Sequence, residues 1–160
     1  MKRILSDKRA LLLSRFLIGT VFIVASIDKI ASPAVFAASV EAYRMLPLWS
    51  VNFLALVIPW LELICGILLL TGVYLRGSSV IMAAFLVIFI AAISSAILRH
   101  LTIDCGCFGS GVSSPVSWLR VAEDAGLLLL TFHVLAFSSP VREATGVSRA
   151  RVDDPAGPFR

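Results

Sequence analysis

The chain has 160 residues, of which 59% are hydrophobic and only 15% are charged. Soluble domains carry about 25% charged residues, so this composition argues against a soluble domain and indicates a lipid environment. The formal net charge of +4 lies mostly near the two ends, without a nucleic-acid-binding motif. Membrane topology therefore explains the charge better than a nucleic-acid partner does.

Four apolar stretches are long enough to cross a bilayer as α-helices, because a crossing needs about 20 residues. They lie at residues 11–30, 52–72, 78–98 and 118–137. The connections between them are short, and the segment 32–50 is predicted as a polar connection. The sequence therefore predicts an all-α integral membrane protein, a bundle of four transmembrane helices that passes several times through the cell membrane.

The chain outside these stretches is predicted to be small and unstructured. Residues 1–10 are interpreted as a cytoplasmic N-terminal segment, and residues 11–137 as one transmembrane domain. Residues 138–160 combine charge with Pro and Gly and show no apolar periodicity, which predicts a disordered cytoplasmic tail.

The distribution of positive charge predicts that both termini are cytoplasmic. In that orientation the inner side holds ten of the fourteen Lys and Arg residues, and the outer side holds four. Positive residues favour the cytoplasmic side, so the loop at 99–117 is expected to face outward. A cleaved signal peptide ending near Ala25 is an alternative, but Arg15 interrupts its apolar region.

Cys105 and Cys107 are the most informative residues of the predicted outer loop. One residue separates them, so they can close a very small disulfide ring, and Gly106 supplies the backbone freedom that such a ring needs. A strained disulfide is easily reduced, which suits reversible exchange. Arg99 would favour a thiolate and Asp104 would oppose one at Cys105, which leaves Cys107 the better attacking thiol.

Two other interpretations of this pair remain open. The cysteines are either static residues at a glycine-rich turn, or metal ligands together with His100 and Asp104. The metal interpretation lacks a second ligand pair at a familiar spacing. The third cysteine, Cys65, lies within a span and is predicted to be a buried apolar residue.

Several charged residues fall within the predicted membrane. Each costs about 2.5–3.5 kcal/mol at a helix centre, so each calls for a partner or a function. Glu62 is expected to lie inside the bundle with Lys29 and Arg120 as partners. Arg120 precedes Glu123 by three residues and Asp124 by four, so it can reach either carboxylate.

These charges have two possible roles. One is a paired polar plug that stabilises the bundle. The other is tuning of a cysteine pKa, for which Arg99 and Lys29 are the candidate cations.

Residues 10–137 resemble the MauE/DoxX group of redox-associated membrane proteins, and their cysteine loop is similar to that of its MauE branch. The resemblance depends on the order of residues rather than on any single motif. The matching residues are Arg15, Gly19, Phe22, Lys29, Pro33, Phe36, Tyr43, Leu46, Pro47, Pro59, Glu62, Leu63, Gly66, Gly72 and then Asp104 to Gly109.

The resemblance implies a four-helix membrane bundle that works with thioredoxin-like partners. It also implies a link to maturation of the disulfide-rich small subunit of methylamine dehydrogenase. The chain has no thioredoxin-type Cys-x-x-Cys, so an extracytoplasmic thioredoxin-like partner would be a separate protein.

The first hypothesis is therefore a thiol–disulfide component with Cys105 and Cys107 as its redox pair, and a quinone near Phe108 and Trp118 as a possible electron carrier. The alternatives are a non-catalytic assembly protein, or a transporter of small solutes or metal with Lys29 and Glu62 along its path.

Overall fold

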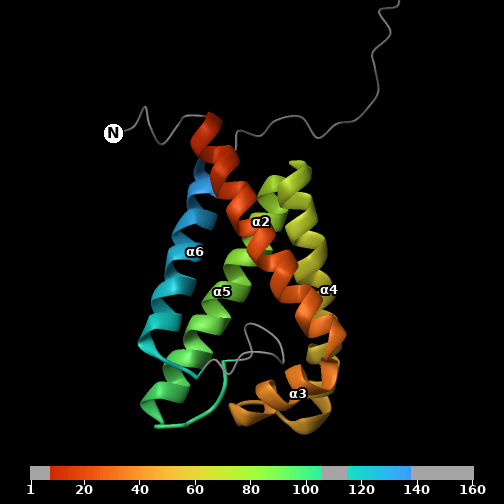
Figure 1. The fold of residues 1–160 in the computed structure, drawn as a ribbon, viewed down its shortest axis with the longest axis vertical. Helices are drawn as coiled ribbons and strands as arrows, with labels where there is room; N and C mark the ends of the chain where they lie inside the picture. The colour runs from red at the N-terminus through yellow and green to blue at the C-terminus, as the bar shows by residue number, and fades with distance from the viewer. Residues whose placement is uncertain (1–7, 106–114, 138–160) are drawn as a thin grey trace, which may run out of the picture.

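The computed structural model describes residues 8–105 and 115–137 and builds them from helices. Four long helices run alongside one another, and the short helix α3 lies across the end where α2 finishes (Figure 1). The helices are α2 (Lys8–Ala31), α3 (Pro33–Ala42), α4 (Leu48–Thr71), α5 (Leu75–Leu98) and α6 (Trp118–Phe137). The predicted all-α class is confirmed for the described part of the chain.

Each predicted apolar stretch falls on one long helix, but the prediction for segment 32–50 is wrong. Most of that segment is helical, as α3 and the beginning of α4. Pro33 occupies the first turn of α3, where its missing N–H costs nothing, and Phe36 is buried. Apart from Ser39 and Glu41 the residues of α3 are apolar, and this short apolar helix lies against the end of the bundle.

Three helices are long and apolar enough to cross a bilayer, namely Arg9–Ala31, Leu48–Thr71 and Leu75–Leu98. The helix α6 is of comparable length but carries Arg120, Glu123 and Asp124 near its beginning. These charges separate α6 from the other three, so the predicted four crossings and the predicted orientation remain predictions. Of the predicted N-terminal segment 1–10, residues 8–10 form the beginning of α2, and residues 1–7 lie outside the described residues, as does the predicted tail 138–160.

A close approach of two glycines joins α2 to α4. A Cβ added at Gly19 would lie 2.8 Å from the Leu70 side chain and 3.1 Å from the carbonyl oxygen of Gly66. A Cβ added at Gly66 would lie 2.8 Å from Ile23. Small residues allow such contact between membrane helices, and this crossing sets how the remaining residues of α2 and α4 face each other.

An apolar core fills the bundle beside this crossing, and Cys65 belongs to it as predicted, with a free thiol. The other buried members of the core are Ile18, Phe22, Leu69, Met82, Leu86 and Val134.

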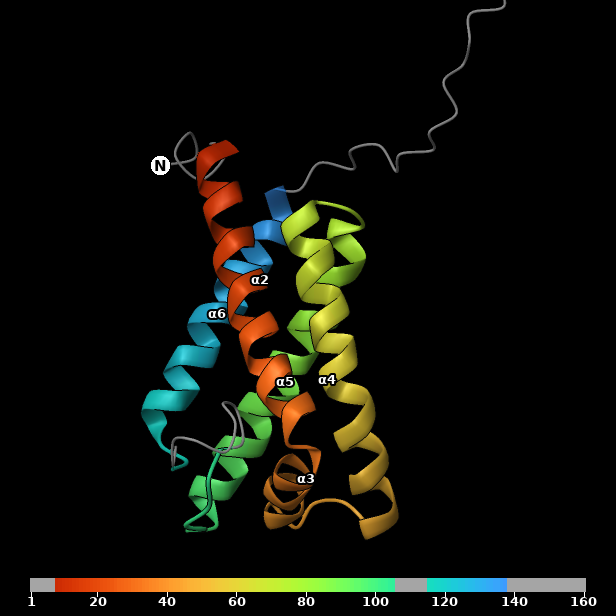
Figure 2. The same cartoon turned by 45° about the vertical axis from the view of Figure 1, so that its right-hand side comes forward.

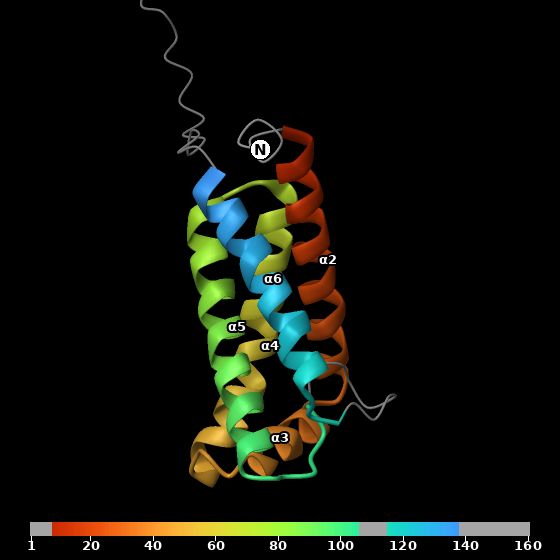
Figure 3. The ribbon, with the colours of Figure 1, turned by 90° about the vertical axis from the view of Figure 1, so that its left-hand side faces the viewer.

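The end of the bundle where α2 begins is tied together by polar side chains. Figure 3 shows the beginning of α2 and the end of α6 at this same end. Arg15 donates from Nε to the carbonyl oxygen of Leu69 at 3.0 Å and from Nη2 to that of Leu70 at 3.3 Å. The guanidinium therefore satisfies carbonyl groups that the last turn of α4 leaves free. Ser14 and His133 join α2 to α6 through a hydrogen bond of 3.3 Å.

Candidate functional site

A buried ion pair joins α2 to α4 in the half of the bundle nearer α3. The Nζ atom of Lys29 donates to Oε1 of Glu62 at 2.9 Å and to Oε2 at 2.7 Å. Lys29 is 4% exposed and Glu62 is 1% exposed. The prediction that Glu62 lies inside the bundle beside Lys29 is confirmed. Because either charge alone would be costly in this environment, each residue requires the other.

Two aromatic rings flank the ammonium group of Lys29. Its Nζ atom lies 5.1 Å from the ring centroid of Phe36 and 5.0 Å from that of Phe89. A cation at this distance is attracted to the electron-rich face of a ring. Phe36 comes from α3 and Phe89 from α5, so the unexpected helix α3 contributes directly to the surroundings of the ion pair.

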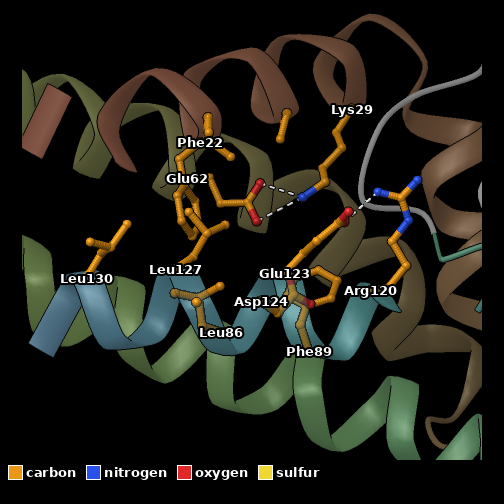
Figure 4. Close-up of a pocket in the computed structure, with 13 residues that line it drawn as sticks. Phe22, Lys29, Glu62, Leu86, Phe89, Arg120, Glu123, Asp124, Leu127 and Leu130 are labelled. Atoms are coloured by element: carbon orange, nitrogen blue, oxygen red, sulfur yellow. Dashed lines mark hydrogen bonds and ion pairs between the residues drawn. The ribbon is translucent and has the colours of Figure 1, made fainter. Parts of the chain in front are cut away.

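A cavity of about 550 Å³ adjoins the ion pair (Figure 4). Figures 1 and 2 show α2 and α6 diverging from the end where α2 begins, and the cavity lies between these two helices with α4 and α5 behind it. Its apolar lining includes Phe22, Leu86, Phe89, Leu127 and Leu130. This volume is within the usual range for small-molecule sites.

The polar lining of the cavity comes from the ion pair and from the beginning of α6. Arg120 donates from Nη1 to Oε2 of Glu123 at 2.7 Å, and both side chains are partly exposed. The Oδ2 atom of Asp124 is buried and has no hydrogen-bond partner among the described residues. The sequence predicted that Arg120 can reach the carboxylate of Glu123 or that of Asp124. In the structure Arg120 pairs with Glu123.

Cys105 lies in a second cluster of hydrogen-bonded residues, at the α3 end of the bundle. It is 1% exposed and disulfide-bonded. The hydroxyl of Tyr43 donates to the carbonyl oxygen of Cys105 at 3.0 Å, and Nη1 of Arg99 donates to the carbonyl oxygen of Tyr43 at 2.8 Å. Ile93 and Ala96 of α5 belong to the same buried cluster. These contacts fix the backbone of Cys105 against α5 and the end of α3.

The hydroxyl of Tyr43 is protonated, as its hydrogen bond to Cys105 requires. Burial, with a smaller contribution from the negative charge of Asp124, raises the pKa of Tyr43 to about 12. The hydroxyl therefore keeps its proton at physiological pH and remains a hydrogen-bond donor to Cys105. Asp124, whose charge contributes to this shift, lines the cavity.

The two ends of the cysteine loop are held together. Asp104 forms an isolated antiparallel bridge with Pro115, and the Val116 amide donates to the carbonyl oxygen of Ile103 at 3.0 Å. The loop therefore begins and ends at one fixed place. Cys107, on which the predicted exchange also depends, lies outside the described residues.

The predicted site residues fall into two neighbouring groups. Lys29, Glu62, Arg120, Glu123 and Asp124 line the cavity. The second group, at the base of the loop, consists of Arg99, Asp104 and Cys105.

The sequence assigned no role to Tyr43, which binds both Cys105 and Arg99 in the second group. The one available signal was a tyrosine in an apolar chain, because a buried hydroxyl generally needs a partner. The predicted thiolate-stabilising cations have other contacts, since Lys29 binds Glu62 and Arg99 binds the Tyr43 carbonyl.

The metal alternative gains no support from the described part of the chain. Within residues 8–105 and 115–137, no three His, Cys, Asp or Glu side chains are grouped so that they could hold an ion.

Long apolar helices, a buried ion pair and a cysteine loop at one end define an α-helical membrane protein with its polar groups concentrated beside that loop. The chain belongs to the methylamine utilisation protein MauE family, whose model matches residues 7–137. The expected MauE resemblance is confirmed, whereas the wider likeness to DoxX proteins remains a prediction.

Curated relatives carry the same family name. The chain is 37% identical over 123 residues to the methylamine utilization protein MauE of Methylorubrum extorquens, which covers 76% of this chain and 66% of the relative. It is 33% identical over 135 residues to that of Paracoccus denitrificans, which covers 84% of this chain and 71% of the relative. The chain thus spans about two thirds of the length of these relatives. No solved structure matches it.

Proposed function

We propose that this protein is a multi-pass inner-membrane component of thiol–disulfide exchange. In this proposal Cys105 and Cys107 form a reversible disulfide that exchanges with an extracytoplasmic thioredoxin-like protein. By analogy with the relatives' names, the exchange supports methylamine utilisation through maturation of a disulfide-containing protein. The observation that carries the proposal is a disulfide-bonded Cys105 fixed at the base of a closed loop.

The burial of Cys105 assigns different roles to the two cysteines. A partner protein cannot approach a sulfur in a side chain that is 1% exposed, so the partner thiolate attacks Sγ of Cys107. The bond between Cys107 and the partner forms as the bond to Cys105 breaks, and Cys105 leaves as the thiolate. A second thiolate of the partner then attacks the mixed disulfide, so the partner leaves with an internal disulfide and Cys105 and Cys107 remain as thiols. Attack by Cys105 on the mixed disulfide reverses the first step.

The proposal includes four membrane crossings with both termini inside. The beginning of α2 and the end of α6 lie at the same end of the bundle (Figure 3), which requires an even number of crossings between them. Near the beginning of α6, Glu123 is paired with Arg120 and the Oδ2 atom of Asp124 is buried beside the cavity, which weakens the main objection to α6 as a crossing helix. The ten-to-four distribution of Lys and Arg then favours cytoplasmic termini.

Capture of a mixed disulfide tests the exchange. With Cys105 changed to Ser, the thiolate of Cys107 can still attack the disulfide of an oxidised partner, and no Cys105 thiolate is present to resolve the mixed disulfide. This variant should therefore accumulate a covalent complex with a thioredoxin-like protein that dissociates on reduction. Cys107→Ser should accumulate less, because Cys105 is buried. Cys65→Ser is the matched control and should behave as wild type. If neither loop variant captures a partner while both insert normally, the exchange proposal is wrong.

A second function, that of a non-catalytic assembly protein, is favoured by the same burial of Cys105, since a static disulfide would also be buried. Replacement of both loop cysteines by Ser distinguishes the two functions. An assembly protein should still support its client, whereas an exchange component should lose all of its activity.

A further inference from the structure

We propose that the cavity between α2 and α6 binds the ring of an isoprenoid quinone, which serves as the electron partner of the cysteine pair. This inference rests on the proposed function, because a disulfide that oxidises partner after partner needs a co-reactant that removes its electrons. The structure contributes a place for that co-reactant, and its shape, lining and polar groups select this chemical class.

The shape of the cavity suits a ring that enters from the bilayer. Its volume of about 550 Å³ can hold a substituted ring and the beginning of a tail. The edge of the cavity on α6 includes Glu123 and Gly126, which are exposed, so the cavity is open on this side. A ligand with a long apolar tail can therefore place its ring inside while the tail remains in lipid.

The lining offers two flat aromatic surfaces and few polar groups. Phe22 and Phe89 lie on the wall near the ion pair (Figure 4), and aromatic rings stack favourably against a planar ring. A sugar or an amino acid would leave many hydrogen bonds unmade against such a wall. A quinone has only its two ring oxygens as strong polar groups, together with any ring substituents.

The polar groups of the cavity match the two oxidation states of a quinone. The Oδ2 atom of Asp124 is a buried acceptor that has no partner in the described part of the chain, and a hydroquinone hydroxyl would donate to it. Lys29 has three N–H donors, and two of them point at Glu62. The third can donate to a quinone carbonyl.

The redox step balances between the cysteine pair and the ring. Closing the disulfide between Cys105 and Cys107 removes two electrons and two protons from the two thiols. The quinone takes up both electrons and both protons, and its two carbonyls become hydroxyls.

Two glycines provide a matched pair of variants for the test. A Cβ at Gly126 or at Gly77 would meet no atom within 4 Å, so neither position obstructs a larger side chain at Cβ. Gly126 lines the cavity, whereas Gly77 lies near the beginning of α5 and outside it. Gly126→Phe should therefore obstruct the cavity, and Gly77→Phe should control for the effect of Phe in a helix.

The experiment uses the full chain in lipid nanodiscs with an azido-quinone photolabel. We expect labelling of the peptides containing Phe22, Phe89 or Leu127 in the wild type and in the double Cys→Ser variant. Gly126→Phe should reduce this labelling by at least about tenfold. With the label reduced to its hydroquinone before illumination, Asp124→Leu should reduce labelling by about tenfold, the effect of one lost hydrogen bond to a charged group. Gly77→Phe should label normally.

The proposal is overturned if labelling is confined to lipid-facing residues, if Gly126→Phe labels like Gly77→Phe, or if a photoactivatable phospholipid labels the cavity as efficiently as the quinone. In a second measurement, reduced wild-type protein is mixed with a short-chain quinone. We expect one hydroquinone to form for each disulfide formed. Quinone binding without this reaction overturns the role of electron partner. Because binding is measured without cysteines and mixed-disulfide capture without quinone, each proposal can fail alone.

Discussion

The two ends of the bundle use charge in different ways. Where α2 begins, the guanidinium of Arg15 is directed at backbone carbonyls of α4, and α6 is held close by the bond between Ser14 and His133. Around the open cavity nearer α3, the charges of Lys29 and Arg120 are directed at the carboxylates of Glu62 and Glu123, and a carboxylate oxygen of Asp124 has no partner among the residues that are described. The first arrangement fastens helices together, whereas the second leaves polar groups available to a ligand.

The largest expected effect comes from breaking the ion pair at the α3 end. Glu62→Gln leaves the ammonium of Lys29 buried without its counter-charge, and we expect a loss of about 3–5 kcal/mol in the free energy of unfolding. Reversible unfolding in mixed micelles would measure it. The double variant Lys29→Met/Glu62→Met should recover much of the stability, because an apolar pair of similar size replaces a desolvated ion pair.

The double variant also separates structure from function. If the pair only stabilises the bundle, the double variant keeps both stability and exchange activity. If the ion pair contributes to the function of the cavity, the double variant should be stable but have reduced exchange activity. A Glu62→Gln variant with the stability of the wild type would contradict the account of this end.

The opposite end is tested by a smaller change at Gly72. This residue has a φ of +84°, and a Cβ there would collide with the guanidinium of Arg15. Gly72→Ala should therefore cost about 1–2 kcal/mol for the left-handed backbone, plus the disturbance of the Arg15 contacts. Gly77→Ala is the control, because its Cβ meets open space in a helix and should be neutral or stabilising by about 0.5–1 kcal/mol. Equal stability of the two variants would show that Arg15 does not depend on Gly72.

A still smaller change in stability is expected at Tyr43. Tyr43→Phe removes its hydrogen bond to the Cys105 carbonyl and should cost about 1 kcal/mol, with faster alkylation of Cys105 after reduction. The other tyrosine of the chain, Tyr74, is 63% exposed and supplies the control Tyr74→Phe. Unchanged alkylation in Tyr43→Phe would mean that this hydrogen bond does not protect the cysteine.

The smallest effect is expected for the pair of Arg120 and Glu123 at the edge of the cavity. Glu123 is 49% exposed, and such a pair one helical turn apart contributes about 0.2–0.5 kcal/mol. Glu123→Gln should therefore unfold almost as the wild type does. A loss as large as that of Glu62→Gln would show that Arg120 and Glu123 form a structural ion pair of the same kind as Lys29 and Glu62.

Much of the fold was predictable because long apolar runs in a sequence indicate membrane helices. The ion pair was predictable as well, since two opposite charges at similar depth in adjacent spans have few other partners. The helix α3 was not, because its ten mostly apolar residues are too few to cross a bilayer and show no strong helical periodicity, and Phe36 is the residue that α3 buries against the bundle.

The roles of Arg15 and Tyr43 were also beyond the sequence. Both donate to backbone carbonyls of residues that are distant in the chain. Because every residue has a backbone carbonyl, the sequence does not indicate which one accepts the hydrogen bond. The cavity likewise depends on how α2 and α6 diverge, which no local pattern encodes.

A redox titration of the full chain tests the central claim most directly. The Cys65→Ser variant, which lacks the free thiol, is equilibrated in nanodiscs with glutathione buffers of increasing reducing strength. It is then denatured, so that the buried Cys105 is accessible, and treated with a mass-shifting maleimide. The account predicts that Cys105 and Cys107 gain the label together over a narrow range of potential and lose it when the buffer is reoxidised. A disulfide that stays closed until the protein unfolds, or two thiols that are labelled without any reductant, would contradict it.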